Sequence, residues 1–513
     1  MMQGHYSGVE ASGIRRYVPL LVWAIIILVI LTIPLTIISY GYLPPDDALR
    51  DTAQAVCGKP WSEILVLGNP YTLDHEFGWH ALLRQSHLWT NCDAEGLVVC
   101  SVVALFTLVG WSALPWLKRP EAWLGVLILI ALEPDIEGRF TMGRPLLLTL
   151  SLLIVILSIW HKYGSSPPRW PVGMWMTVMI AIAVFVHGAW YLWALPVAAF
   201  FMARQYRWGA TLAAACVAGT VLGAAFTGHP VDYILGAVRF AFRSTGMHET
   251  QHVLVSELQP FGSELMAGGS IFFLALLAAL WVMRQLAGLN ARPLTSNPAF
   301  WLVCLGWALG FKARRFWEDW GCPALMVLLA FDLQLLLQTR LAAGSFKRLA
   351  LTCGLAGTLY LAVTNDIDAR WTSALRQDNL TWQYLRPDNP QLAGWFPEKG
   401  GIFYSASMDF FYQAFFKNPN GDWRYLLGFE PALMPDDDFA IFRRILWTSG
   451  DPMAYKPWVD KMRPQDRLVI VGGGPILPEL EWNYSVKGVW IGRLPVTNAA
   501  PPTPMPLKTN APP

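Results

Sequence analysis

Two adjacent carboxylates, Asp46 and Asp47, directly follow the first long apolar segment of this chain. A carboxylate within hydrogen-bond reach of a substrate hydroxyl or amine can act as a general base. The surrounding run, Pro-Pro-Asp-Asp-Ala-Leu-Arg, is also typical of a helix N-terminus, where an aspartate caps the first turn. Both roles fit at once, so we expect Asp46 to cap the helix and Asp47 to be the functional carboxylate.

A short cationic segment carries Lys312, Arg314 and Arg315 between aromatic residues. Side chains of this kind bind phosphate or pyrophosphate groups through charge-assisted hydrogen bonds. Local pairing is the alternative, since Glu318 and Asp319 follow within the same turn. We expect phosphate binding, because positive charge is disfavoured on the outer side of a membrane, where the topology below places this segment.

A short acidic segment offers Glu133, Asp135 and Glu137 in alternation. Carboxylate oxygens suit a hard divalent cation such as Mg²⁺ or Mn²⁺, and Glu133 and Asp135 are the candidate ligands. Ion pairing with Arg139 and Arg144 is the alternative, because acidic residues in a short loop are usually solvated or paired.

Three histidines, His75, His80 and His187, lie in or beside the same polar segments. Their spacing is not that of a zinc-binding HExxH helix, so a zinc site is not expected. We expect them to contact substrate. For His187, which falls at the end of an apolar segment, an interfacial hydrogen bond is the alternative.

The elements that must position these residues are membrane helices. The 513 residues are 54% hydrophobic and 14% charged, whereas soluble domains carry about 25% charged residues. The first apolar segment, residues 18–40, is long enough to cross a bilayer. Ten more follow, at residues 96–116, 122–133, 146–160, 171–187, 189–203, 209–227, 266–283, 298–311, 321–339 and 349–364. The fold class is therefore an α-helical polytopic membrane protein with about 11 transmembrane helices.

Basic residues fix the orientation of these segments. With a cytoplasmic N-terminus, six successive inner segments are all basic, as the positive-inside rule requires; they contain Arg15-Arg16, Lys118-Arg119, Lys162 with Arg169, Arg204 with Arg207, Arg284 with Arg292, and Arg340 with Lys347-Arg348. Both carboxylates then lie in a first outer loop, residues 41–95, and the chain from residue 365 is also outside. We expect a multi-pass protein of the cell inner membrane.

The chain divides into three parts on this interpretation. Residues 1–364 form the transmembrane domain, residues 365–500 a C-terminal periplasmic domain of α/β or α+β type, and the proline-rich residues 501–513 a disordered tail. Strands are expected around residues 401–404 and 467–471. In the first outer loop, Cys57 and Cys92 either form a disulfide or remain separate thiols.

The layout resembles the GT-C class of polytopic glycosyltransferases. The resemblance rests on the first span followed by Pro-Pro-Asp46-Asp47, on Glu133-Pro-Asp135 as an acidic motif in the second outer loop, and on the cationic segment from Lys312. It implies inverting transfer of a sugar from a polyprenyl-phosphate donor in the membrane lipid to a glycan, lipid or protein acceptor. Asp46 or Asp47 would then be the base, the cations would hold the donor phosphate, and a divalent metal could assist.

Three other classes remain open from the sequence. A transporter or flippase predicts charged residues deep in the membrane, where Asp332 is the clearest. A surface-polysaccharide polymerase or ligase predicts a long, late outer loop with Arg and His, which residues 228–265 partly supply. A non-catalytic assembly partner would keep the fold and lose the chemistry.

Overall fold

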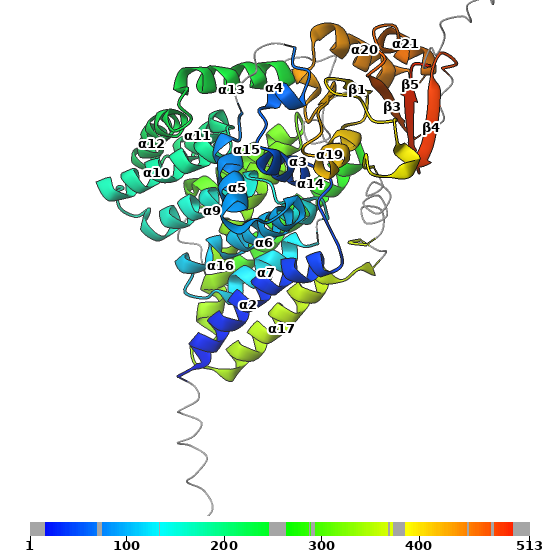
Figure 1. The fold of residues 1–513 in the computed structure, drawn as a ribbon. Coiled ribbons are helices and arrows are strands. Elements are labelled where there is room, and N and C mark those ends of the chain that lie inside the picture. Colours follow the sequence, from blue (N-terminus) through cyan, green and yellow to red (C-terminus); the bar gives the residue numbers. More distant parts are fainter. Residues whose placement is uncertain are drawn as a thin grey trace, which may run out of the picture.

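The computed structural model describes residues 16–68, 74–132, 134–245, 263–286, 288, 293–367, 370–372, 385–448, 451–472 and 477–495. This part of the protein is mostly helical, with a small C-terminal sheet at one end of a large helical bundle (Figure 1). The expected tail, residues 501–513, and residues 246–262 of the loop expected at residues 228–265 lie outside the described residues. The proposed domain boundaries stay a prediction.

Each of the eleven apolar segments is helical, because long apolar stretches satisfy their backbone groups internally as helices. The helices are α2 (Val18–Ser39), α6 (Ala94–Ser112), α7 (Glu121–Ile130), α9 (Leu146–Tyr163), α10 (Trp170–Val186), α11 (Ala194–Met202), α12 (Tyr206–Ala225), α14 (Ser263–Leu286), α15 (Pro298–Gly310), α16 (Cys322–Arg340) and α17 (Phe346–Thr364). Six described helical stretches are long and apolar enough to cross a membrane: Val18–Ser39, Ala94–Trp116, Leu146–Tyr163, Tyr206–Ala225, Trp317–Arg340 and Phe346–Thr364. The protein is thus a polytopic membrane protein, while the number of about 11 spans stays a prediction.

Contacts between helix ends show which ends of the membrane helices lie on the same side of the bundle. At the end nearer the sheet, the Tyr40 hydroxyl donates to the Thr364 carbonyl at 3.1 Å, which also shows that α2 and α17 run parallel. At the opposite end, the guanidinium of Arg348 at the start of α17 binds Glu121 at the start of α7. This grouping agrees with the alternation expected from the sequence.

The expected first outer loop is itself helical. It forms α3 (Asp47–Cys57), α4 (Trp61–Ile64) and α5 (Phe77–Thr90). Helix α3 ends at Gly58, whose φ of +63° is the left-handed conformation that favours glycine. Cys57 and Cys92 are both free thiols, so of the two alternatives left open by the sequence the structure has the separate thiols.

The C-terminal segment folds into a five-stranded sheet of order β2-β1-β3-β5-β4. The strands are β1 (Ile402–Ser405), β2 (Arg424–Tyr425), β3 (Arg467–Val471), β4 (Glu481–Val486) and β5 (Val489–Arg493), so both expected strands are confirmed. Strand β1 runs parallel to β2 and β3, whereas β5 pairs antiparallel with β3 and β4. The remaining helices are α8 (Pro134–Thr141), α13 (Pro230–Thr245), α19 (Met408–Lys417), α20 (Asp436–Trp447) and α21 (Lys456–Val459).

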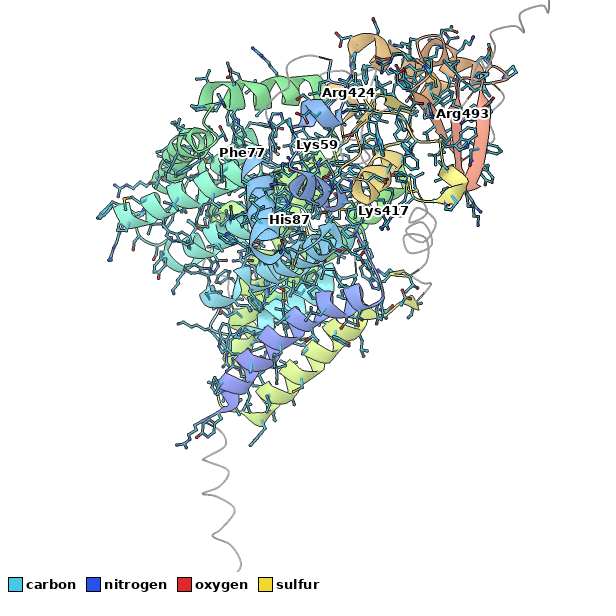
Figure 2. The ribbon with its side chains drawn as sticks, viewed as in Figure 1. Lys59, Phe77, His87, Lys417, Arg424 and Arg493 are labelled. Carbon is cyan, nitrogen blue, oxygen red and sulfur yellow. The ribbon has the colours of Figure 1, made fainter. Side chains whose placement is uncertain are left out.

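Alternating side chains place the two faces of the sheet in different cores. Phe403 of β1 packs with α3, α4 and α19, whereas Tyr404 packs with α20 and α21. The first face joins the sheet to the helical bundle by packing against α3 and α4. At the edge of the sheet, the backbone of Leu65 also forms a β-bridge with Tyr425 of β2. Nearby, the Lys59 ammonium donates to the Gly421 carbonyl at 2.7 Å (Figure 2). The sheet region and the α3–α5 segment are therefore packed as one unit.

Asp332, the residue that a transporter predicts deep in the membrane, lies in α16. Its carboxylate accepts a hydrogen bond from Nε of Arg284 in α14 at 3.0 Å. The charge is thus neutralised within the bundle.

Candidate functional site

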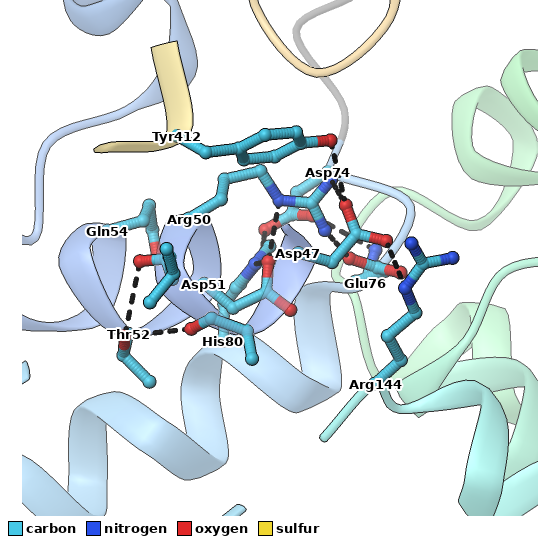
Figure 3. Close-up of polar contacts among 12 residues, drawn as sticks. Asp47, Arg50, Asp51, Thr52, Gln54, Asp74, Glu76, His80, Arg144 and Tyr412 are labelled. Carbon is cyan, nitrogen blue, oxygen red and sulfur yellow. Dashed lines mark hydrogen bonds and ion pairs between the residues drawn. The ribbon is translucent and has the colours of Figure 1, made fainter. Parts of the chain in front are cut away.

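A cavity of about 170 Å³ lies where α3 and α5, the ends of membrane helices and the C-terminal segment meet. Its lining includes residues from three separate parts of the chain: Asp47, Arg50, Asp74, His75, Glu76 and His80 from the first loop; Arg144, His187, Tyr191 and Arg315 from helix ends; and Tyr412, Phe429 and Glu430 from the C-terminal segment. Charged groups dominate one wall, shown in Figure 3.

Asp46 and Asp47 take different places at the start of α3. Asp46 occupies the N-cap position, but its side chain makes no capping hydrogen bond, so the expected capping role is wrong. Its carboxylate pairs with the guanidinium of Arg144 instead, because the arginine offers a charged donor in place of a backbone N–H. Asp47 borders the cavity, and Asp46 is not among its lining residues.

Three donors converge on Asp47. The Arg50 Nη1 lies 2.9 Å from Oδ1, and the Tyr412 hydroxyl donates to the same oxygen at 3.2 Å (Figure 3). The Nε of Arg144 lies 3.2 Å from Oδ2. Two guanidiniums favour the ionised form of a carboxylate. Asp47 is therefore a firmly held anion.

Arg50 is the centre of the charged wall. It is buried, and besides Asp47 its Nε donates to Asp51 at 2.6 Å and its Nη2 pairs with Glu76. One guanidinium thus serves three carboxylates. The helical spacing of residues 47, 50 and 51 puts them on adjacent positions of α3, and α5 brings Glu76 to the same guanidinium.

His80 is held in the charged form. Its Nδ1 contacts Asp74 and its Nε2 lies 3.0 Å from Asp51. Burial alone would lower the pKa of His80, but the two carboxylates outweigh burial and raise it to about 10. An imidazolium therefore sits behind the charged wall and anchors Asp51.

Glu76 is shifted towards its protonated form. Burial raises its pKa to about 8, and the charges of Asp51 and Asp47 add to this shift, while Arg50 opposes it. Glu76 is consequently the carboxyl group of the wall that exchanges its proton near neutral pH.

The charged wall is poorly suited to a metal ion. The ligand atoms of Asp51, Glu76 and His80 lie within 4.8 Å of one another, as a metal site requires. However, Arg50 already pairs with both carboxylates, and both ring nitrogens of His80 face carboxylates. Of the expected ligands, Glu133 is outside the described residues, as is the side chain of Asp135. The divalent cation stays a prediction.

The cationic segment is divided by the structure. Arg315 borders the cavity, whereas Lys312 is exposed and Arg314 is not among the lining residues. Arg314 Nε donates to Glu318 at 2.9 Å and Arg315 Nε to Asp319 at 3.4 Å. Local pairing, the alternative considered from the sequence, is therefore present, and of the three cations Arg315 is the one placed to reach a ligand.

All three candidate histidines line the cavity. His187 follows α10, and burial together with Arg315 lowers its pKa to about 3, so its imidazole is neutral. Its Nδ1 is buried without a hydrogen-bond partner among the described residues. The backbone carbonyl of His75 accepts a hydrogen bond from Gly188 N–H at 2.9 Å, and a Cβ at Gly188 would obstruct this contact.

Several site residues were not predicted as such: Arg50, Asp51, Asp74, Glu76, Arg144, Tyr191, Tyr412 and Glu430. Some carried a local signal, since residues 47, 50 and 51 share a helix face, as do 76 and 80. Tyr412 carried none, because it lies 365 positions from its partner Asp47.

The comparisons with known proteins name no relative. No family model matches this sequence, and no curated protein matches it. The assignment of a function therefore depends on the membrane helices and on the geometry of the cavity.

Proposed function

We propose that this protein is a membrane glycosyltransferase that moves a sugar from a polyprenyl-phosphate donor to a hydroxyl or amine acceptor. The observation that carries the proposal is a single cavity, beside the ends of membrane helices, that combines carboxylates with guanidiniums. A lipid-linked donor keeps its hydrocarbon chain in the bilayer. An enzyme that uses it therefore has to bind the phosphate at the membrane surface, where the membrane helices end.

The two kinds of charge suit the two halves of the reaction. As the bond between the sugar and the phosphate breaks, negative charge grows on the phosphate, and guanidiniums held in place beforehand stabilise it. Arg315 and Arg144 border the cavity and are the residues for this role. The acceptor must lose a proton, which requires a carboxylate. Asp47 is the residue that the sequence assigns to this step, and Glu76 lines the same cavity.

The membrane orientation belongs to the same proposal. The basic segments place the N-terminus in the cytoplasm, which puts the cavity and the sheet on the outer, periplasmic face. A cysteine introduced at exposed Lys399, just before β1, would test this placement: we expect labelling by a membrane-impermeant maleimide in intact spheroplasts, after replacement of the native cysteines.

The test of function uses the purified full chain in proteoliposomes containing a polyprenyl-phosphate sugar, with release of polyprenyl phosphate as the readout. We expect Asp47→Asn to lower the rate at least 100-fold, on the order of 3 kcal/mol in the barrier. Asp46→Asn should have a smaller effect through Arg144, and Glu63→Gln, at an exposed position of α4, should have none.

Two outcomes would contradict the proposal. Full activity in Asp47→Asn would show that the reaction does not take place in this cavity. Movement of the intact donor across the bilayer, without release of polyprenyl phosphate, would identify a transporter instead.

A further inference from the structure

Glu76 differs from Asp47 in how many donors hold it. The Oε2 atom of Glu76 pairs with Arg50, and among the described residues no hydrogen-bond donor reaches Oε1. In Asp47, by contrast, both oxygens are held, one by Arg50 and Tyr412 and the other by Arg144. Each hydrogen-bond donor lowers the proton affinity of the carboxylate oxygen that it binds. Glu76 is thus a lining carboxyl group with an oxygen left for a substrate proton.

The surroundings of Glu76 favour proton exchange. The charged or titratable groups that face it are Asp47, Arg50 and Asp51 from α3, His80 from α5, Asp74 from the preceding segment and Tyr233 from α13. Burial and the neighbouring carboxylates hold its pKa near 8, where a group can both accept and release a proton at neutral pH. A carboxyl group whose pKa is raised in this way is suited to general acid–base catalysis.

We propose that Glu76 is the catalytic base of this site and that Asp47 is a fixed anion that positions Arg50 and Arg144. This inference rests on the proposed function and refines it. The acceptor O–H proton passes to Oε1 of Glu76 as the acceptor oxygen forms its bond to the anomeric carbon. The bond from that carbon to the phosphate oxygen breaks, and the electron pair leaves with the polyprenyl phosphate, whose charge faces Arg315 and Arg144. Glu76 then releases its proton to water and is ready for the next acceptor.

The first measurement compares Glu76→Gln with Glu63→Gln in the proteoliposome assay. Glutamine matches glutamate in shape and resembles its protonated form, which predominates at pH 7, so we expect Glu76→Gln to fold and to bind donor normally. Loss of the base should lower kcat 10²- to 10⁴-fold, while the KM for the donor stays within about threefold. Retention of a third or more of wild-type kcat would overturn the assignment.

The second measurement is the pH profile of kcat, which a purely structural role of Glu76 would not shape. Because the base must be ionised, the wild-type rate should rise with pH and level off above about 8. In Glu76→Asp, the surviving activity should show a displaced midpoint. A wild-type rate that is already level at pH 6 would point to Asp47 as the base.

Chemical rescue separates the two carboxylates directly. Formate should restore part of the activity of Glu76→Ala, because a small carboxylate can occupy the vacated place, but it should not rescue Asp47→Ala. The reverse pattern would overturn the inference. Failure of the proposed function has a distinct signature, since the wild-type protein itself would then release no polyprenyl phosphate.

Discussion

Two buried arginine–carboxylate clusters lie at opposite ends of the helical bundle, and only one borders a described cavity. The Arg50 cluster, made of Asp47, Arg50, Asp51, Glu76 and His80, lies at the end nearer the sheet. The Glu121 cluster, made of Arg119, Glu121 and Arg348, lies at the other end, where α7 and α17 begin.

The clusters differ in the ratio of their charges. At Glu121, one fully buried carboxylate receives a bidentate pair from Arg348, with Nε at 2.7 Å and Nη2 at 2.9 Å, and Arg119 lies 3.7 Å away. At Arg50, three carboxylates share two cations of the cluster, the Arg50 guanidinium and the His80 imidazolium, while Arg144 reaches Asp47 from outside the cluster. Where cations outnumber carboxylates, every carboxylate oxygen is paired and the acid does not exchange its proton. Where carboxylates outnumber cations, one carboxyl group can exchange a proton. On the function proposed above, this ratio would separate the structural ion pair at Glu121 from the reactive carboxyl group at Arg50.

The largest expected effect follows removal of the shared guanidinium. Arg50→Gln leaves three partly or fully buried carboxylates short of a counter-charge, so we expect a loss of about 3–5 kcal/mol in stability together with loss of transfer. Thermal unfolding in detergent and the transfer rate of the folded fraction measure the two effects. A variant that unfolds more easily but transfers normally would mean that the Arg50 cluster is as structural as the Glu121 cluster.

The matching change in the other cluster should separate stability from activity. Glu121→Gln leaves Arg119 and Arg348 without their anion, and we expect a loss of about 3 kcal/mol. The transfer rate per folded molecule should stay within twofold of wild type, because these residues lie at the end of the bundle away from the cavity. Glu95→Gln, at an exposed position of α6, is the control for a carboxylate without such partners. A parallel fall in specific activity would show that the two ends are coupled.

A smaller effect is expected from Arg315→Gln, which tests the cationic side of the cavity. Loss of a charge-assisted hydrogen bond to the donor phosphate should lower kcat/KM for the donor about tenfold, or about 1.4 kcal/mol. Lys312→Gln is the control in the same segment, since Lys312 is exposed and is not among the lining residues. Equal effects of the two changes would support the expectation from the sequence that the whole cationic segment binds the phosphate.

The sequence revealed elements with a local signal. Long apolar segments predicted eleven helices, and short apolar segments separated by turns rich in Pro and Gly predicted β1 and β3, because an element that is buried needs a run of apolar residues. Asp47 and the three histidines were found as polar residues beside apolar segments, and all four line the cavity.

Residues whose role depends on distant partners escaped prediction. Arg144 lies 98 positions from Asp46, and its pairing with that residue displaced the expected helix cap. Glu76 lies 26 positions from Arg50. Arg315 was expected to act together with Lys312 and Arg314, but the turn of the helix directs Arg314 to Glu318. A one-dimensional pattern shows which residues carry charge, whereas the fold decides which charges meet.

The smallest expected effect concerns the hydrogen bond from Tyr412 of the C-terminal segment to Asp47. Tyr412→Phe removes the hydroxyl and leaves the buried ring in place within the core that joins α3 and α19. We expect a net loss of about 1 kcal/mol in the positioning of Asp47, seen as a roughly fivefold fall in kcat with thermal stability nearly unchanged. Tyr425→Phe, also in that core, is the matched control, because its hydroxyl accepts from Trp423 instead. If the two variants behave alike, the sheet region supports the cavity by packing alone. If only Tyr412→Phe slows transfer, the C-terminal segment is part of the chemistry of the Arg50 cluster.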